Sequence, residues 1–158
     1  MRSFKTKETF PLIYLASSTF EHCKTKEDQR KCLMSIYKAL KKAGMLAFDI
    51  SQNPERKPQG SWWVEKQELG RDEIVRTIFS KLNLQNNVVS VHLFFEVYMN
   101  GKLKQKYYEC GEARISSKTE IEELLKDVGF EIENVYGDFD KSTYDANSKG
   151  AVFIARRR

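Results

Sequence analysis

One short loop gathers the side chains best suited to acid–base chemistry. It runs Ser17-Ser18-Thr19-Phe20-Glu21-His22-Cys23 and follows an apolar stretch that ends at Ala16. His22 is a candidate general base, because an unperturbed imidazole titrates close to neutral pH. The alternative is that His22 hydrogen-bonds to the backbone and holds the loop in place.

A second polar loop, from Gly137 to Gly150, contains Asp138 and Asp140. Their carboxylates could orient the amino group of a substrate, although Asp is also common in tight turns. An apolar substrate pocket would need aromatic walls, and the candidates for these are Phe20, Trp62, Trp63 and Tyr136. Packing in a core is the simpler explanation for each of these four side chains.

The cysteines do not form a recognisable site. Cys23, Cys32 and Cys110 are an odd number and include no C-x-x-C pair, which argues against a disulfide framework and a structural zinc site. We interpret all three as reduced, packed thiols. A nucleophilic role for Cys23 is the alternative, because this residue lies in the candidate loop. The sequence contains no metal-ligand cluster, serine triad or phosphate-binding loop.

The composition is that of a globular domain. The chain has 158 residues, of which 41% are apolar and 31% charged, and its net charge is +5. No apolar run approaches the roughly 20 residues of a membrane helix, and the first residues lack a signal-peptide core. These features predict a cytoplasmic protein. Aromatic residues do not clearly alternate with the basic ones along the strands, so we regard nucleic-acid binding as unlikely.

The candidate loop is predicted to lie within a β-α-β unit. Phe10 to Ala16 and Leu46 to Ile50 read as strands that should be parallel, and Thr25 with Asp28 predicts the start of the helix between them. Gly44 is expected just past the end of that helix, with positive φ. In open α/β sheets ligands bind at the carboxyl ends of the strands, which is where this loop begins.

The middle of the chain changes to a strand pattern. Strands are predicted over Trp62 to Gln67, Glu73 to Leu84, Val88 to Met99 and Lys102 to Ile115, with tight turns at Asn86-Asn87 and Asn100-Gly101. After them, Ser117 and Glu120 form a capping box, Gly129 ends a helix, and strands follow at Phe130 to Tyr136 and Ala151 to Ala155. We therefore expect a single domain, with an α/β part at 1–55 and 116–158 and an antiparallel β arm at 56–115.

These elements resemble a known family in their order and spacing. The segment ending in Phe48-Asp49-Ile50 resembles the "LKPGGxLxFDI" motif of class I S-adenosylmethionine-dependent methyltransferases. The stretches 10–13 and 18–22 are similar to the family's "FDLI…NSFxH", 25–29 to its "T-x-E-D-Q", and 135–140 to its "VYGDFD". The resemblance covers nearly the whole chain.

The resemblance implies a partial Rossmann-like methyltransferase sheet with helices, carrying an inserted antiparallel β meander. It also implies methyl transfer from S-adenosylmethionine to a small-molecule acceptor. By the same resemblance, Met1 and Arg2 flank the adenine and Ala16, Ser17 and Ser18 line the cofactor. We assign Phe20, Trp63, Tyr136 and Asp138 to the acceptor side, and His22 as the catalytic residue.

One family feature is absent from the sequence. No two of its glycines stand one residue apart, so the family's glycine-rich cofactor loop has no counterpart here. We therefore expect only the carboxyl-terminal half of the fold, truncated and inactive alone. The alternative is a non-catalytic ligand-binding or interaction module derived from a methyltransferase. An unpaired edge strand at Phe10 to Ala16 further predicts a homo-oligomer that forms through this edge or through the β arm.

Overall fold

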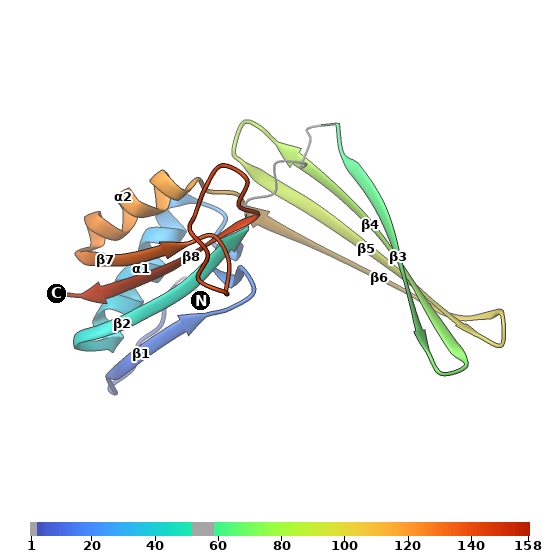
Figure 1. Ribbon diagram of the computed structural model, residues 1–158, viewed down its shortest axis with the longest axis horizontal. Helices are drawn as coiled ribbons and strands as arrows, with labels where there is room; N and C mark the ends of the chain where they lie inside the picture. Colours follow the sequence, from blue (N-terminus) through green and yellow to red (C-terminus); the bar gives the residue numbers. More distant parts are fainter. Residues whose placement is uncertain (1–2, 52–58) are drawn as a thin grey trace. The chain divides into compact units, whose positions relative to one another are not determined.

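The computed structural model describes residues 3–51 and 59–158, and the chain divides into two compact units (Figure 1). Unit 1 comprises Met1–Asn53 and Arg114–Arg158, and unit 2 comprises Pro54–Ala113. The elements of unit 1 are β1 (Phe10–Leu15), the 3₁₀ helix η1 (Thr19–His22), α1 (Lys26–Ala39), β2 (Leu40–Ser51), α2 (Lys118–Val128), β7 (Phe130–Tyr136) and β8 (Gly150–Arg157).

Unit 1 contains a mixed four-stranded sheet in the order β1-β2-β8-β7. β1 pairs in parallel with β2, as the β-α-β pattern predicted, and β8 is antiparallel to both β2 and β7. β1 therefore lies at one edge of the sheet. The carboxyl ends of β1 and β2 meet at the same end of the sheet, and β8 begins there (Figure 1).

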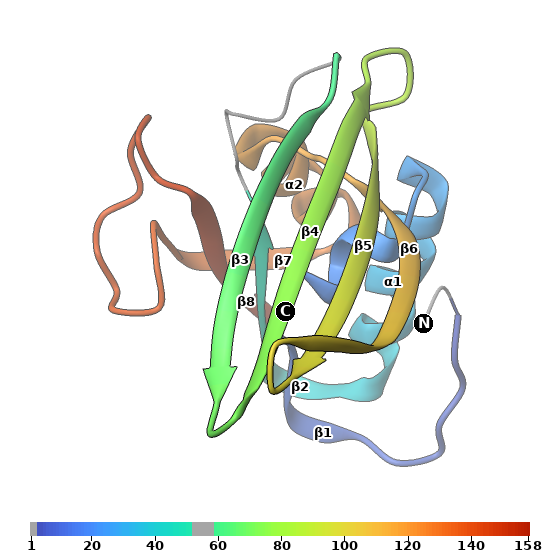
Figure 2. The same cartoon turned by 90° about the vertical axis from the view of Figure 1, so that its right-hand side faces the viewer.

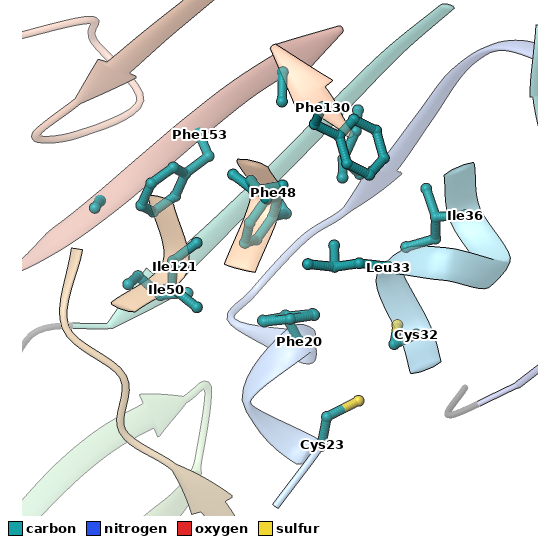
Figure 3. Close-up of a cluster of buried hydrophobic side chains, with 14 of the residues drawn as sticks. Phe20, Cys23, Cys32, Leu33, Ile36, Phe48, Ile50, Ile121, Phe130 and Phe153 are labelled. Atoms are coloured by element: carbon teal, nitrogen blue, oxygen red, sulfur yellow. The ribbon is translucent and has the colours of Figure 1, made fainter. Parts of the chain in front are cut away.

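The core of unit 1 lies on one face of this sheet. Phe48 of β2 stacks on Phe153 of β8 with ring centroids 5.2 Å apart, and Phe20 of η1 packs on Phe48 at 5.1 Å (Figure 3). The apolar stripe of α1 joins the same cluster through Leu33 and Ile36, and α2 joins it through residues such as Ile121 and Leu125. Both α-helices of unit 1 thus cover the same face.

The opposite face of the sheet is apolar but much more exposed. Leu12 and Tyr14 of β1 stand beside Met45 and Ala47 of β2, and Ala47 stands beside Ile154 of β8. Tyr14 is 71% exposed. Among the residues that the structure describes, no α-helix packs on this face.

Local signals placed the helix starts correctly. The Thr25 hydroxyl accepts a hydrogen bond from the Asp28 amide at 3.0 Å, and the Ser117 hydroxyl accepts one from the Glu120 amide at 3.2 Å. Gly129 ends α2 with φ 106°, a left-handed conformation that suits glycine. Each of these three predictions is confirmed.

The predicted role of Gly44 is wrong. α1 ends at Ala39, and Gly44 lies inside β2, while Ala43 takes the positive φ of 60°. Glycine is needed at 44 for a different reason. A Cβ there would lie 2.8 Å from the carbonyl oxygen of Lys41 and 3.1 Å from that of Phe10, because the backbones approach closely.

A buried polar network joins the two helices of unit 1. Arg114, which is 5% exposed, donates to Gln29 of α1 at 3.3 Å and to Ser116 at 2.5 Å. Its guanidinium also pairs with the Glu120 carboxylate at 2.8 Å, and Lys26 of α1 pairs with the same carboxylate at 2.8 Å. The network satisfies the buried arginine and holds the start of α2 against α1.

Unit 2 is a four-stranded antiparallel sheet in the order β3-β4-β5-β6 (Figure 2). Its strands are β3 (Ser61–Leu69), β4 (Asp72–Asn83), β5 (Val88–Met99) and β6 (Lys102–Arg114), in agreement with the predicted meander. Asn100 and Gly101 both take positive φ, 50° and 71°, as expected for a two-residue hairpin turn.

Aromatic rings cross unit 2 on one face of its sheet. Trp62 packs on Phe79 at 4.5 Å between ring centroids, and Phe79 lies 5.8 Å from His92. His92 in turn contacts the Tyr108 hydroxyl at 2.7 Å. Of the described apolar side chains in this unit, only Ile78 and Val89 are buried, so its faces expose much apolar surface.

The cysteines differ from one another in their surroundings. Cys23 and Cys32 are buried in the core of unit 1, as predicted, and neither forms a disulfide. Cys110 is exposed on β6, so its assignment as a packed thiol is wrong. The exposed residue lies on a strand with little apolar packing of its own, since most of β6 is exposed.

No helix in the described part of the chain is long and apolar enough to span a membrane.

Candidate functional site

The loop that leaves β1 has an unusual backbone. Ser17 and Ser18 both take left-handed conformations, with φ 57° and 53°. The Ser18 amide donates to Oδ2 of Asp49 at 2.8 Å, and the Ser18 hydroxyl donates to the same oxygen at 3.0 Å. Left-handed backbone is unfavourable for residues other than glycine, so these hydrogen bonds help to hold the turn.

A second carboxylate ties the same loop to the end of β2. The Ser51 amide donates to Oε1 of Glu21 at 2.6 Å, and the Ser51 hydroxyl donates to it at 2.8 Å. Glu21 belongs to η1 and is 3% exposed. Asp49 and Glu21 therefore link the ends of β1 and β2 in opposite directions, one from β2 to the loop and one from the loop to β2.

A cavity of about 200 Å³ opens beside these hydrogen bonds. Ser18, Asp49 and Ser51 line one side, and Asp138, Phe139 and Lys149 come from the loop between β7 and β8. Asp49 is buried, and its Oδ1 accepts no hydrogen bond from any described residue. The cavity thus combines hydroxyls, two carboxylates and one ammonium with apolar walls.

Some of the predicted site residues meet at this cavity. Ser18 and Asp138 both line it, although 120 positions separate them in the chain. Tyr136 comes directly before Gly137, which also lines the cavity. Ala16 and Ser17 stand at the end of β1 and are exposed.

Other predicted site residues lie elsewhere. Phe20 is fully buried in the core, where it packs on Phe48 rather than lining the cavity. His22 is exposed at the end of η1 and is not among the lining residues. Trp63 belongs to unit 2, where it stands opposite Ile78. Met1 and Arg2 lie outside the described residues.

Sequence reasoning did not select Asp49, Glu21 or Ser51 as site residues. Asp49 and Ser51 lie at the carboxyl end of β2, and Glu21 lies in η1, which follows β1. Buried polar groups at such places need partners. Asp49 stands out in the sequence as the acidic residue between Phe48 and Ile50, both of which are buried. A carboxylate inside an apolar strand was the available signal.

Comparisons with known proteins fit this arrangement. No family model matches the chain. The chain is 24% identical over 151 residues to "Putative methyltransferase YqeM" of Bacillus subtilis (strain 168), with 94% of this chain and 59% of that protein covered. An S-adenosylmethionine-dependent methyltransferase from Clostridium acetobutylicum ATCC 824 superimposes with a TM-score of 0.82 at 15% identity, covering 98% of this chain and 61% of that one.

The fold is that of the class I S-adenosylmethionine-dependent methyltransferases. The methyltransferase CcbJ of Streptomyces caelestis also superimposes, with a TM-score of 0.80 at 17% identity over 99% of this chain and 61% of that one. The predicted fold class and the resemblance are thereby confirmed. The chain spans about three fifths of the length of these methyltransferases.

Proposed function

We propose that this chain takes part in methyl transfer from S-adenosylmethionine to a small-molecule acceptor, and that it forms the acceptor side of the site. The observation that supports this most directly is the cavity at the joined carboxyl ends of β1 and β2, with Ser18 and Asp138 on its walls. Open α/β sheets bind their ligands at these strand ends.

Similar structures support both the cofactor and the size of the acceptor. CalS10 of Micromonospora echinaspora was solved with S-adenosylmethionine bound and is described as an amino pentose methyltransferase. KedS8 of Streptoalloteichus is described as a sugar N-methyltransferase. A cavity of about 200 Å³ suits one functional group of such an acceptor better than a macromolecule.

The residue roles are those that the family resemblance implies. Ala16, Ser17 and Ser18 stand where the cofactor would pass the end of β1, with Met1 and Arg2 assigned to its adenine side. Asp138 and Tyr136 would contact the acceptor, and His22 remains the proposed base for it. Trp63 is also assigned to the acceptor. Phe20 would act indirectly, because it is buried against Phe48 and supports the loop by packing.

The described residues fit one side of the cofactor. The left-handed turn at Ser17 and Ser18 presents a polar strand end, but the amide and hydroxyl of Ser18 are already bonded to Asp49. The sequence offers no glycine turn that would let the backbone approach the cofactor closely. These 158 residues by themselves should therefore bind S-adenosylmethionine weakly and transfer no methyl group. A non-catalytic ligand-binding module is the second candidate, and the same missing turn favours it.

Isothermal titration calorimetry tests this proposal directly. Each missing hydrogen bond removes about 1 kcal/mol, so losing three or four weakens binding by roughly a hundredfold or more. We expect a Kd for S-adenosylmethionine well above about 100 µM for the chain alone. A micromolar Kd would overturn the half-site proposal. A methyltransferase assay with the same preparation is the second check. Both candidates expect no transfer by the chain alone, so measurable transfer by these residues would contradict both.

A further inference from the structure

The two oxygens of the Asp49 carboxylate have very different surroundings. Oδ2 accepts from the Ser18 amide at 2.8 Å and from the Ser18 hydroxyl at 3.0 Å. Oδ1 has no partner among the described residues, although Asp49 is buried and only 9% exposed. A buried acceptor left unpaired is unfavourable, and a buried charge more so. This oxygen needs a donor that the described residues do not supply.

The charges around the cavity indicate what kind of donor fits. Asp49 and Asp138 contribute two carboxylates, and Lys149 contributes one ammonium. Asp138 is exposed, and its Oδ1 accepts from the Phe139 amide at 2.7 Å. Lys149 is exposed, and no ion pair joins it to Asp49 within the described ranges. The cavity therefore carries a net negative charge beside an unfilled acceptor.

We propose that this cavity binds the amino group of the acceptor, with Oδ1 of Asp49 and the carboxylate of Asp138 as its hydrogen-bond acceptors. The inference rests on the proposed function, because it names the chemistry of the group held at that site. A protonated amine offers several N–H donors and compensates the negative charge. A hydroxyl offers one donor and leaves the charge in place. Asp49 acts as a binding residue here, and it also holds the Ser18 turn.

Asp49→Asn separates these two roles. The amide oxygen of Asn can still accept from Ser18, while its NH₂ group places a donor where Oδ1 was. The variant also removes a buried charge, so its thermal stability should be equal to or higher than that of the parent chain. Asp127→Asn, at an exposed carboxylate on α2, is the matched control for the loss of one negative charge.

The test is nuclear magnetic resonance of the ¹⁵N-labelled 158-residue chain, titrated at pH 7 with benzylamine and separately with benzyl alcohol. Benzylamine should shift the amide signals of Ser18, Gly137 and Gly150 in a saturable way at millimolar concentration, and benzyl alcohol should not. Asp49→Asn should weaken benzylamine binding at least tenfold, and Asp127→Asn should leave it unchanged.

Three results would overturn the inference. These are equal shifts with benzyl alcohol, unchanged benzylamine binding in a folded Asp49→Asn variant, and benzylamine shifts confined to residues away from the cavity. The proposed function fails separately. If the cavity binds amines but the protein never takes part in S-adenosylmethionine-dependent transfer, the proposed function is wrong and this inference stands. If the protein takes part in transfer only to hydroxyl acceptors and never to amines, the proposed function stands and this inference is wrong.

Discussion

At the scale of single residues, burial separates the three thiols. Cys23 and Cys32 lie in the core of unit 1 (Figure 3). Cys110 is exposed on β6. The hydrogen bond between the Cys32 thiol and Cys23, together with burial, raises the pKa of the Cys32 thiol far above its usual value. Because the thiolate is the reactive form, Cys32 should be inert in the folded protein.

Thiol titration with a disulfide reagent checks this prediction. In the native chain Cys110 should react fast, and the two buried cysteines should react at least roughly a hundredfold more slowly, through opening of the core. Cys110→Ser should abolish the fast phase, and denaturant should expose all the remaining thiols. A fast phase that persists in Cys110→Ser would mean that the loop after β1 opens readily.

At the scale of elements, the hairpin between β5 and β6 depends on backbone conformation rather than on packing. Gly101 takes φ 71°, and a Cβ added there would meet no atom within 4 Å. Gly101→Val should nevertheless lower the free energy of unfolding by about 1–2 kcal/mol, because left-handed backbone is unfavourable for a β-branched residue. Urea or thermal unfolding measures the change.

Gly111→Val is the matched control for this hairpin. Gly111 lies in β6, and a Cβ there would also meet nothing within 4 Å, but its φ is not positive. Valine favours strands, so this variant should be neutral or slightly stabilising. Equal destabilisation by the two variants would show that the loss comes from bulk and not from the turn.

The packing of α1 on α2 should depend on pH through Glu120. Burial raises the pKa of this carboxyl, but the Arg114 guanidinium and the Lys26 ammonium outweigh burial and bring the pKa below its usual value of 4.5. A lowered pKa means that the folded state favours the ionised form. Its contribution to stability is therefore complete above about pH 4.5 and is lost as the pH falls through the folded-state pKa.

Arg114→Met should make this dependence visible. Removing one partner of a buried pair costs about 3–5 kcal/mol, so the variant should be much less stable at pH 7. It should also lose less of its remaining stability on acidification, because the pKa of Glu120 is no longer lowered by Arg114. Lys26→Met is the control, since the Lys26 side chain is 72% exposed and exposed pairs contribute under about 1 kcal/mol. Urea unfolding at several pH values measures this dependence. Equal changes in stability for the two variants would contradict the role assigned to the Arg114–Glu120 pair.

At the scale of the whole molecule, the sheet of unit 1 has one apolar face and one edge that the described residues leave uncovered. β1 is the edge strand, and Leu12 and Tyr14 project from it into solvent. Unpaired apolar edges recruit further strands, although Pro11 removes one backbone donor from this edge. We propose that the chain self-associates through β1 or through the β5–β6 hairpin.

Light scattering coupled to size exclusion tests self-association and identifies the surface. The mass should exceed the 18.5 kDa of one chain and should rise with concentration. Leu12→Lys on β1 and Leu103→Lys beside the hairpin are a matched pair, because the two leucines are 48% and 43% exposed. The variant that returns the protein to a monomer marks the interface. A parent chain that stays monomeric at millimolar concentration would refute the proposal.

The amino-acid sequence by itself determined the features that depend on near neighbours. The caps at Thr25 and Ser117, the end of α2 at Gly129 and the Asn100-Gly101 turn are set by interactions within a few residues, so each was predicted correctly. The alternation along β5 likewise predicted the meander. The order of these elements was enough to predict the α/β fold.

Tertiary structure alone decided the features in which distant segments meet. Gly44 is required by the carbonyl of Phe10, 34 positions earlier, and no local pattern carries that constraint. Ser18, Asp49 and Asp138 come from three separate segments, and only the pairing of β1, β2 and β8 brings them to one cavity. The unpaired oxygen of Asp49 is a further example, because a missing partner can be recognised only when every neighbour in space is known.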